Sequence, residues 1–312
     1  RIILNEVYMD WKNKFPQEHR YFETDNGILY CGDCLDTIKN FPDECIDLVI
    51  TSPPYDTLRF YHMNNEKELK TFWNFDKFIQ IAKELSRILC KGGVIVWVVN
   101  DETINGSETG TSFKQALYFK EQCGLCLYDT MIYAKYNVKF PTKNKYNQIF
   151  EYMFVFSKGK VKTFNPLIDQ PNKSYGKTSW GLSSYRDKNG ILQKKEKINV
   201  KSPYRLRNNI WYYSNGYNVS TQDEIAYKHP AIFPDKLAYD HIYTWSNEND
   251  IVLDPFMGSG TVAKQCQILN RKWIGIEINS DYCEIIKKRL LYNNEVIHYI
   301  ETGKLKLDNI LF

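Results

Sequence analysis

The chain has 312 residues, of which 43% are hydrophobic and 25% are charged, and its formal net charge is +4. This length supports one large domain or a domain with an insertion, and the composition is typical of a globular protein. No apolar stretch reaches the ~18 residues of a membrane-spanning helix, and the first residues lack the apolar core of a secretory signal. The sequence therefore argues against a membrane protein, and we expect a cytoplasmic one.

Apolar runs alternate with helical patterns along the first 160 residues. Strands are expected over 28–31, 46–51, 94–99, 127–136 and 151–157, and helices over 35–41, 72–89 and 112–123. We expect an arm or a short helix over 1–20, loops over 56–71 and 100–111, and an end to the helix over 72–89 at Gly92-Gly93. The last two strands are expected to form a hairpin with a long connection. Strands that alternate with helices predict an α/β fold with a doubly wound, mostly parallel sheet.

The strand over 46–51 runs directly into Thr51-Ser52-Pro53-Pro54-Tyr55. The two prolines fix their φ angles and remove two backbone donors, so the Ser52 hydroxyl and the Pro53 carbonyl remain as acceptors. Tyr55 adds an aromatic face on which a planar ring can stack. Acceptors beside a stacking face suit a planar substrate with an exocyclic amino group, such as adenine or cytosine. An ordinary strand-ending turn is the alternative, since proline pairs often mark turns.

Positive charge is concentrated between residues 158 and 207. Thirteen lysines and arginines and three acidic residues give this segment a formal charge of +10, which leaves −6 for the rest of the chain. Basic residues interleaved with aromatic ones, here Phe164, Tyr175, Trp180, Tyr185 and Tyr204, are typical of a nucleic-acid surface. A solubilising loop region is the alternative. Because the segment interrupts the alternation of strands and helices, we expect an insertion within one catalytic domain.

Beyond the basic segment, helices are expected from Asp235, over 261–269 and over 280–292, and strands over 251–253 and 273–277. The sequence Asp254-Pro-Phe-Met-Gly258-Ser-Gly260-Thr261 lies between a strand and a helix. Glycines let a ligand approach the backbone closely, and a helix N-terminus offers free N–H groups. Glu277 ends the next strand, where a carboxylate can accept hydrogen bonds from ribose hydroxyls.

Two cofactors fit this glycine sequence. The spacing Gly258-x-Gly260-x-x-Ala263 is that of a dinucleotide site, whereas S-adenosyl-L-methionine has a ribose but no phosphate. Asp254 favours S-adenosyl-L-methionine, because a carboxylate repels a pyrophosphate and attracts an ammonium and a sulfonium. A glycine turn that serves close packing is the third interpretation.

The pairs Cys31-Cys34 and Cys123-Cys126 each have the spacing of half a zinc site. The two pairs lie outside the usual ribbon spacing of ~15–20 residues, and each has an apolar context. We therefore expect reduced, buried cysteines and no metal.

The two halves together resemble the S-adenosylmethionine-dependent DNA amino-methyltransferases, which methylate N4 of cytosine or N6 of adenine. The resemblance rests on residues 32–35, 51–55, 151–158, 229–234 and 254–261. The catalytic sequence precedes the basic segment and the cofactor sequence follows it, which is the permuted order of the β group. The resemblance implies a Rossmann-like methyltransferase fold with an inserted target-recognition region.

The resemblance and the basic segment also imply site residues and a domain order. Catalysis is assigned to Ser52, Pro53, Pro54 and Tyr55. Cofactor binding is assigned to Asp33, Cys34, Leu35, Thr51, His229, Pro230, Phe233, Pro234, Asp254, Pro255, Phe256, Gly258, Ser259, Gly260, Thr261, Glu277 and Ile278, although helix entry and core packing are alternatives for His229 and Phe233. DNA binding is assigned to Arg59, Lys173, Lys177, Arg186, Lys194, Lys195, Lys197, Arg205 and Arg207. The expected order is an N-terminal arm (1–20), a catalytic half (21–158), the target-recognition region (159–222) and a cofactor-binding half (223–312).

In this family, serine at the first position of the proline sequence is commoner in N4-cytosine enzymes, and aspartate or asparagine in N6-adenine enzymes. Ser52 therefore favours N4 of a cytosine flipped out of duplex DNA, with N6 of adenine as the alternative. The expected partners are double-stranded DNA and a possible cognate restriction endonuclease, for a monomer or a homodimer away from membranes. An RNA or protein methyltransferase, a catalytically dead nucleic-acid-binding module and a nicotinamide dehydrogenase stay open as further interpretations.

Overall fold

The structure is a computed structural model that describes residues 11–54, 73–136, 145–176, 184–194 and 202–302, with side chains up to residue 291. The chain divides into two compact units. The larger unit consists of Arg1–Asn165 and Asn209–Phe312, and the smaller one is Pro166–Asn208.

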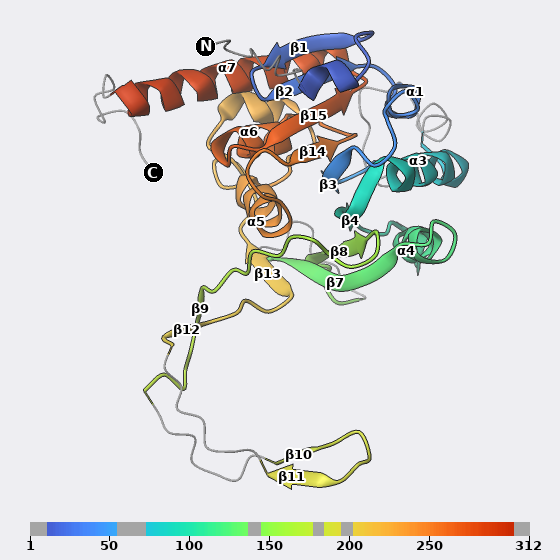
Figure 1. The fold of residues 1–312 in the computed structure, drawn as a ribbon, viewed down its shortest axis with the longest axis vertical. Coiled ribbons are helices and arrows are strands. Elements are labelled where there is room, and N and C mark those ends of the chain that lie inside the picture. Colours follow the sequence, from blue (N-terminus) through green and yellow to red (C-terminus); the bar gives the residue numbers. More distant parts are fainter. Residues whose placement is uncertain (1–10, 55–72, 137–144, 177–183, 195–201, 303–312) are drawn as a thin grey trace, which may run out of the picture. The chain divides into compact units, whose positions relative to one another are not determined.

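A nine-stranded sheet forms the centre of the larger unit, in the order β1-β2-β15-β14-β3-β4-β8-β7-β13 (Figure 1). The strands are β1 (Arg20–Thr24), β2 (Gly27–Cys31), β3 (Ile46–Thr51), β4 (Leu89–Val99), β7 (Cys126–Lys135), β8 (Phe150–Ser157), β13 (Ile210–Tyr213), β14 (Ile251–Asp254) and β15 (Lys272–Glu277). The five neighbours from β2 to β4 are parallel, whereas β8 is antiparallel to β4 and β7, and β1 is antiparallel to β2. The predicted mostly parallel sheet is confirmed.

Helices cover both faces of this sheet, as a doubly wound fold requires (Figure 1). One group contains α1 (Cys34–Ile38), α3 (Phe75–Ile88) and α4 (Thr111–Glu121), and the other contains α5 (Asp235–Trp245), α6 (Thr261–Ile268) and α7 (Ser280–Thr302). Short 3-10 turns lie at Trp11–Lys14 and Glu224–Lys228. The apolar run at the end of β4 is buried throughout. The centre of the Trp97 ring lies 5.8 Å from that of Phe78 in α3 and 5.2 Å from that of Phe119 in α4.

The parallel strands bring polar groups to one edge of the sheet. Ser52 follows β3, Asp254 is the last residue of β14, and Glu277 is the last residue of β15. Because β8 runs against its neighbours, its first residues lie at the same edge as the last residue of β7. Ligands of open α/β sheets bind outside the carboxyl ends of the strands, so this edge is where a site is expected.

The expectation that Gly92-Gly93 ends α3 was wrong, because this helix already ends at Ile88. The pair lies inside β4, where residues between Leu89 and Val94 leave the regular register with β3. Gly92 has a φ of +75°, and a Cβ atom there would lie 2.9 Å from the Lys160 carbonyl oxygen. The glycines therefore permit the close approach of residues 158–162.

Two other local predictions were wrong. The expected loop 100–111 contains a small hairpin, β5 (Thr103–Ile104) and β6 (Ser107–Glu108), whose Asn105-Gly106 turn has positive φ at both residues. The edge strand β1, which pairs with β2, was not expected, and it begins at the last residue of the expected arm or short helix 1–20. The last helix continues to Thr302, ten residues beyond its expected end. The expected loop 56–71 lies outside the described residues.

The smaller unit contains two short antiparallel ribbons. One pairs β9 (Gln170–Pro171) with β12 (Tyr204–Arg205), and the other pairs β10 (Ser184–Arg186) with β11 (Leu192–Lys194). This unit lies inside the expected target-recognition region 159–222, but β13 of that region belongs to the main sheet. Among the described residues, no helix is long and apolar enough to cross a membrane.

Gly27 provides a test of the packing between β2 and β15. A Cβ atom on Gly27 would lie 1.7 Å from the ring of Trp273, which is fully buried. We expect Gly27→Ala to lower the free energy of unfolding by about 1–3 kcal/mol, because the ring has to move. Chemical denaturation measures this change. Gly32→Ala is the matched control, since a Cβ there meets no atom within 4 Å, and an equal loss in both variants would contradict this packing.

Candidate functional site

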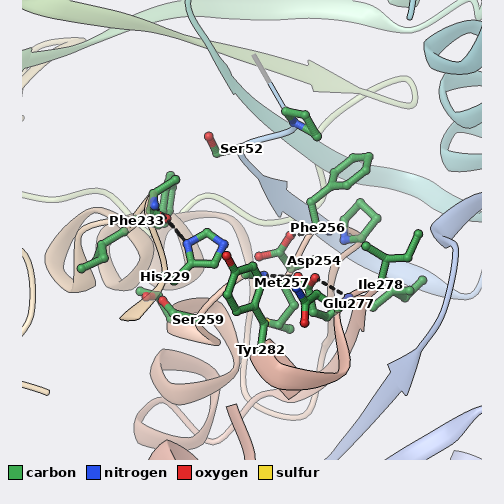
Figure 2. Close-up of a pocket in the computed structure, with 18 of the residues that line it drawn as sticks. Ser52, His229, Phe233, Asp254, Phe256, Met257, Ser259, Glu277, Ile278 and Tyr282 are labelled. Atoms are coloured by element: carbon green, nitrogen blue, oxygen red, sulfur yellow. Dashed lines mark hydrogen bonds between the residues drawn. The ribbon is translucent and has the colours of Figure 1, made fainter. Parts of the chain in front are cut away.

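A pocket opens at the carboxyl edge of the sheet, and Ser52 and Gly258 both line it (Figure 2). The ends of β14 and β15 and the loop after β14 form one wall, and residues 229–234 form another. Figure 2 shows His229 and Phe233 opposite Asp254, Phe256 and Glu277. The residues that line the pocket are Gly32, Cys34, Ser52, Pro54, Tyr133, Lys135, Glu151, Asn215, His229, Ala231, Ile232, Phe233, Pro234, Asp254, Pro255, Phe256, Met257, Gly258, Ser259, Thr261, Ile276, Glu277, Ile278, Asn279 and Tyr282.

Asp254 links the two sequence motifs physically. Its Oδ1 accepts a hydrogen bond from the Thr51 hydroxyl at 2.6 Å and another from the Phe256 backbone N–H at 3.0 Å. The side chain is buried, and burial raises the pKa of Asp254 to about 7 against these two hydrogen bonds. The last residue of β3 is thereby fixed to the last residue of β14.

Glu277 holds the loop that follows β14. Its Oε2 accepts from the Gly258 N–H at 2.9 Å, and its Oε1 accepts from the Asn279 N–H at 2.9 Å. Burial raises the pKa of Glu277 to about 7 as well. Each carboxylate oxygen can accept more than one hydrogen bond, so both can still receive donors from a ligand in the pocket.

Gly258 is held at a positive φ of +55°, under the ring of His229. A Cβ atom on Gly258 would lie 3.1 Å from His229 Cε1, which explains why glycine stands there. The His229 ring is fixed by Ala231, whose carbonyl oxygen lies 2.8 Å from Nδ1, and by an edge contact with Tyr282 at 4.4 Å. The segment 229–234 therefore closes over the glycine loop.

A buried charge network supports this loop from behind. Arg289 of α7, whose side chain is fully buried, donates to the Ser259 carbonyl oxygen at 2.6 Å and to Asp223 Oδ2 at 2.9 Å. Lys264 of α6 contacts Asp223 at 2.8 Å and Asp235 at 2.9 Å. Burial alone raises the pKa of Asp223, but the two cations outweigh burial, and the pKa lies below its usual value. The network joins the glycine loop to the segment that carries His229.

The far side of the pocket carries a second ion pair. Lys135, at the end of β7, pairs with Glu151 of β8, and its Nζ lies 5.4 Å from the centre of the Tyr133 ring. All three residues line the pocket. The resemblance drew on the sequence around Glu151, but no sequence reasoning had assigned these side chains to the site.

The structure brings most of the expected site residues to the pocket. Ser52, Pro54, Cys34, His229, Phe233, Pro234, Asp254, Pro255, Phe256, Gly258, Ser259, Thr261, Glu277 and Ile278 line it. The residues expected at the site that do not line it are Asp33, Leu35, Thr51, Pro53, Pro230 and Gly260. The Asp33 carboxylate caps α1 through the Leu35 N–H at 2.8 Å and pairs with Lys77, so its side chain serves the local structure. Tyr55 lies outside the described residues.

Five of the expected DNA-binding residues lie within the part of the chain that the structure describes. Lys173, Arg186, Lys194 and Arg205 are exposed, whereas the Arg207 side chain is 13% exposed and its Nε lies 3.0 and 3.1 Å from the two carboxylate oxygens of Asp169. Arg207 therefore has an acidic partner within its own unit. Arg59, Lys177, Lys195 and Lys197 lie outside the described residues.

The chemistry of the lining fits S-adenosyl-L-methionine. Two carboxylates, Asp254 and Glu277, suit a ligand with positive charge and ribose hydroxyls, and they disfavour a pyrophosphate. The aromatic and apolar side chains of Phe233, Phe256 and Ile278 also line the pocket, and such side chains suit a purine ring. The His229 ring fills the space beside Gly258 that any larger residue would need.

Comparison with known proteins places these features in a family. The sequence model described as DNA methylase, for N6 and N4 enzymes, matches residues 46–288. The orphan methyltransferase M.BamHII of Bacillus amyloliquefaciens is 52% identical over 266 residues, which cover 85% of this chain and 96% of that protein. The type II methyltransferase M.BamHI of the same organism is 30% identical over 299 residues, which cover 92% of this chain and 62% of that protein.

Solved structures share the fold. The PvuII DNA methyltransferase, named as cytosine-N4-specific, superposes with a TM-score of 0.65 at 21% identity and covers 94% of this chain and 99% of its own. A DNA modification methylase from Thermus thermophilus, complexed with S-adenosyl-L-methionine, has a TM-score of 0.55 at 21% identity, with 85% and 93% covered.

Arg289 is expected to stabilise the site and the fold together. We predict that Arg289→Met lowers the free energy of unfolding by about 3–5 kcal/mol, because it removes a fully buried cation and leaves the partly buried carboxylates of Asp223 and Asp235 with one cation fewer. Chemical denaturation measures the loss. Lys287→Met on the same helix is the control, since Lys287 is 41% exposed and reaches Glu284 only at 4.0 Å. Equal, small effects in both variants would show that the network contributes little.

Proposed function

The chain belongs to the family of N6/N4 DNA methylases, and we propose that it transfers a methyl group to N4 of a cytosine flipped out of duplex DNA. Its cofactor is S-adenosyl-L-methionine, which supplies a methyl group on a positively charged sulfur. The observation that carries the proposal is that Ser52, Asp254 and Glu277 open onto one pocket. A single pocket lets a substrate amine at Ser52 meet a methyl donor held by the two carboxylates.

The carboxylates and the glycine loop hold the cofactor in this proposal. Glu277 accepts hydrogen bonds from the ribose hydroxyls while its two oxygens keep the Gly258 and Asn279 amides in place. Asp254 places negative charge near the positive end of the ligand. Phe256 and Ile278 pack against the purine ring, and His229 and Phe233 close the opposite wall.

The proline corner prepares the amine. An exocyclic amine on an aromatic ring is a weak nucleophile, because its lone pair is delocalised into the ring. The Ser52 hydroxyl oxygen accepts a hydrogen bond from one N–H group of the amine, and the carbonyl oxygen of Pro53 accepts one from the other. These two hydrogen bonds draw the nitrogen towards a tetrahedral shape, so that its lone pair points at the methyl group. The hydrogen bond from Thr51 to Asp254 fixes the corner relative to the cofactor wall. As the N–C bond forms, the bond between the methyl carbon and sulfur breaks, and the nitrogen then releases one proton to water. The acceleration comes from positioning, which requires no covalent intermediate with the enzyme.

The base has to leave the duplex to reach this pocket, because its amino group is inaccessible inside the stack. Tyr55 supplies the stacking face in this proposal. The exposed cations of the smaller unit, Lys173, Arg186, Lys194 and Arg205, contact the DNA phosphates and the grooves. Arg207 orders its own unit through Asp169 instead.

Adenine N6 is the second candidate, because the family includes enzymes for both bases. Ser52 at the first position of the proline corner favours cytosine. The M.BamHII relative is named an orphan methyltransferase, whereas M.BamHI is named a type II methyltransferase. A paired restriction endonuclease, a monomeric or dimeric state and a cytoplasmic location stay predictions for this chain.

The proposed reaction is tested with labelled cofactor and mixed-sequence duplex DNA, followed by mass spectrometry of the nucleosides. We expect label in N4-methylcytosine, at a rate that falls about a hundredfold to a thousandfold in Ser52→Ala, the range for loss of one positioned hydrogen-bond partner in an active site. Cofactor affinity of that variant should stay within about twofold, because Ser52 contacts the amine and not the cofactor. Label in N6-methyladenine would select the second candidate, and an unimpaired Ser52→Ala variant would remove Ser52 from the mechanism.

Cofactor binding should depend on pH near neutrality. Asp254 and Glu277 each have a pKa raised to about 7, so both are protonated in part at pH 6 and ionised at pH 8. A positively charged ligand favours the ionised forms, and binding therefore releases protons and tightens as the pH rises through 7. Titration calorimetry at pH 6, 7 and 8 measures both effects. Glu277→Gln should flatten this dependence, and a pH dependence equal to that of the unmodified chain would contradict the role of Glu277.

A further inference from the structure

We infer that Lys135 is a specificity-determining residue that donates hydrogen bonds to the ring acceptors of the flipped cytosine, N3 and O2, and that Glu151 positions it. This inference rests on the proposed function and names the other half of the substrate pocket. Among the described residues that line the pocket, Lys135 is the only lysine or arginine.

The order of strands separates this pair from the cofactor wall. Along the sheet, the carboxyl edge carries Glu277 on β15, Asp254 on β14 and Ser52 after β3. Beyond β4, which follows β3 in the sheet, the same edge carries Glu151 on β8 and then Lys135 on β7. Ser52 therefore lies between the cofactor carboxylates and the ion pair, and the pair faces the side that the base has to occupy.

The spacing suits one pyrimidine ring. β8 is two strands away from β3, which corresponds to roughly 10 Å at the ordinary strand spacing. The long Lys135 side chain reaches back from β7 to Glu151, and the register of the two strands places Glu151 opposite Tyr133. The ammonium group is thereby held near the Tyr133 ring, 5.4 Å from its centre, instead of extending into solvent.

Base chemistry identifies what this ammonium group binds. Ser52 and Pro53 accept hydrogen bonds from the amino group of cytosine. The next two atoms along the same edge of the base, N3 and O2, are both acceptors and still need donors. A lysine offers three donors and no acceptor, so it pairs with both atoms and repels an amino group placed there. On the Watson–Crick edge of adenine, the amine is followed by the single acceptor N1 and then by a C–H group. The same site therefore favours cytosine.

The burial of the pair supports a functional role. The side chains of Lys135 and Glu151 are only 21% and 12% exposed, and removing two charges from water costs more than a surface pair returns. On the same side of the sheet, Asn215 follows β13 and lines the pocket, and its buried Oδ1 accepts no hydrogen bond from any described residue. Buried polar atoms are normally paired, so this wall is built for a polar ligand.

The test compares two duplexes that carry the modified site, once that site has been found by sequencing DNA methylated by the unmodified chain. One duplex contains the target cytosine and the other an abasic position in its place. Fluorescence anisotropy measures their affinities in the presence of S-adenosyl-L-homocysteine. We expect Lys135→Met to lower affinity for the cytosine duplex by about tenfold to a hundredfold, the range for a hydrogen bond to a charged group, and to leave the abasic duplex within about twofold.

Glu151→Gln should lower the affinity for the cytosine duplex less than Lys135→Met and should also spare the abasic duplex. Lys162→Met is the matched control, because Lys162 pairs with Asp47 outside the pocket, and it should not discriminate between the duplexes. Calorimetry with S-adenosyl-L-homocysteine and thermal unfolding show that each variant is folded.

Equal losses on both duplexes, no loss on either, or weaker cofactor binding in Lys135→Met would overturn the inference, since a cofactor carboxylate would then be the partner of Lys135. Failure of the proposed function gives a different result. In that case the unmodified chain transfers no label to DNA or transfers it to adenine, and no modified cytosine is found.

Discussion

Five neighbouring parallel strands, β2, β15, β14, β3 and β4, end at one edge of the sheet, and this alignment brings Ser52, Asp254 and Glu277 to one pocket. Parallel strands need helical crossovers, so residues that share this edge are far apart in the sequence. The hydrogen bond between Thr51 and Asp254 spans 203 positions, yet it joins adjacent strands. The proline corner and the glycine loop thus meet because of sheet topology.

The site places two buried carboxylates, Asp254 and Glu277, on one side and the largely buried ion pair of Lys135 and Glu151 on the far side. Burial raises the pKa of both Asp254 and Glu277 to about 7, and in the proposed function a positively charged ligand offsets that cost. The ion pair of Lys135 and Glu151 carries no net charge and offers donors to a neutral base. The two walls therefore differ in the kind of ligand that they stabilise, and Ser52 lies at the border between them.

Local sequence was sufficient for the elements that carry their own signal. The apolar run before Ser52 and the glycines around Gly258 predicted a strand, a corner, a loop and a helix because each pattern is set by nearby residues. The ion pair could not be predicted in this way, since its geometry depends on β8 pairing between β4 and β7. Arg289 likewise contacts Ser259 and Asp223, 30 and 66 positions away. Asn105-Gly106 did carry a hairpin signal, which the polar context of residues 100–111 obscured.

The central claim is that one pocket holds a methyl donor on the carboxylate side of Ser52 and a nucleobase on the other side. A crystal structure of the chain with S-adenosyl-L-homocysteine and a duplex containing the modified site measures this directly. The account predicts an extruded cytosine whose N4 lies within hydrogen-bond distance of Ser52 Oγ and points at the cofactor sulfur. A base that remains stacked in the duplex, or a cofactor bound away from Asp254 and Glu277, would contradict it.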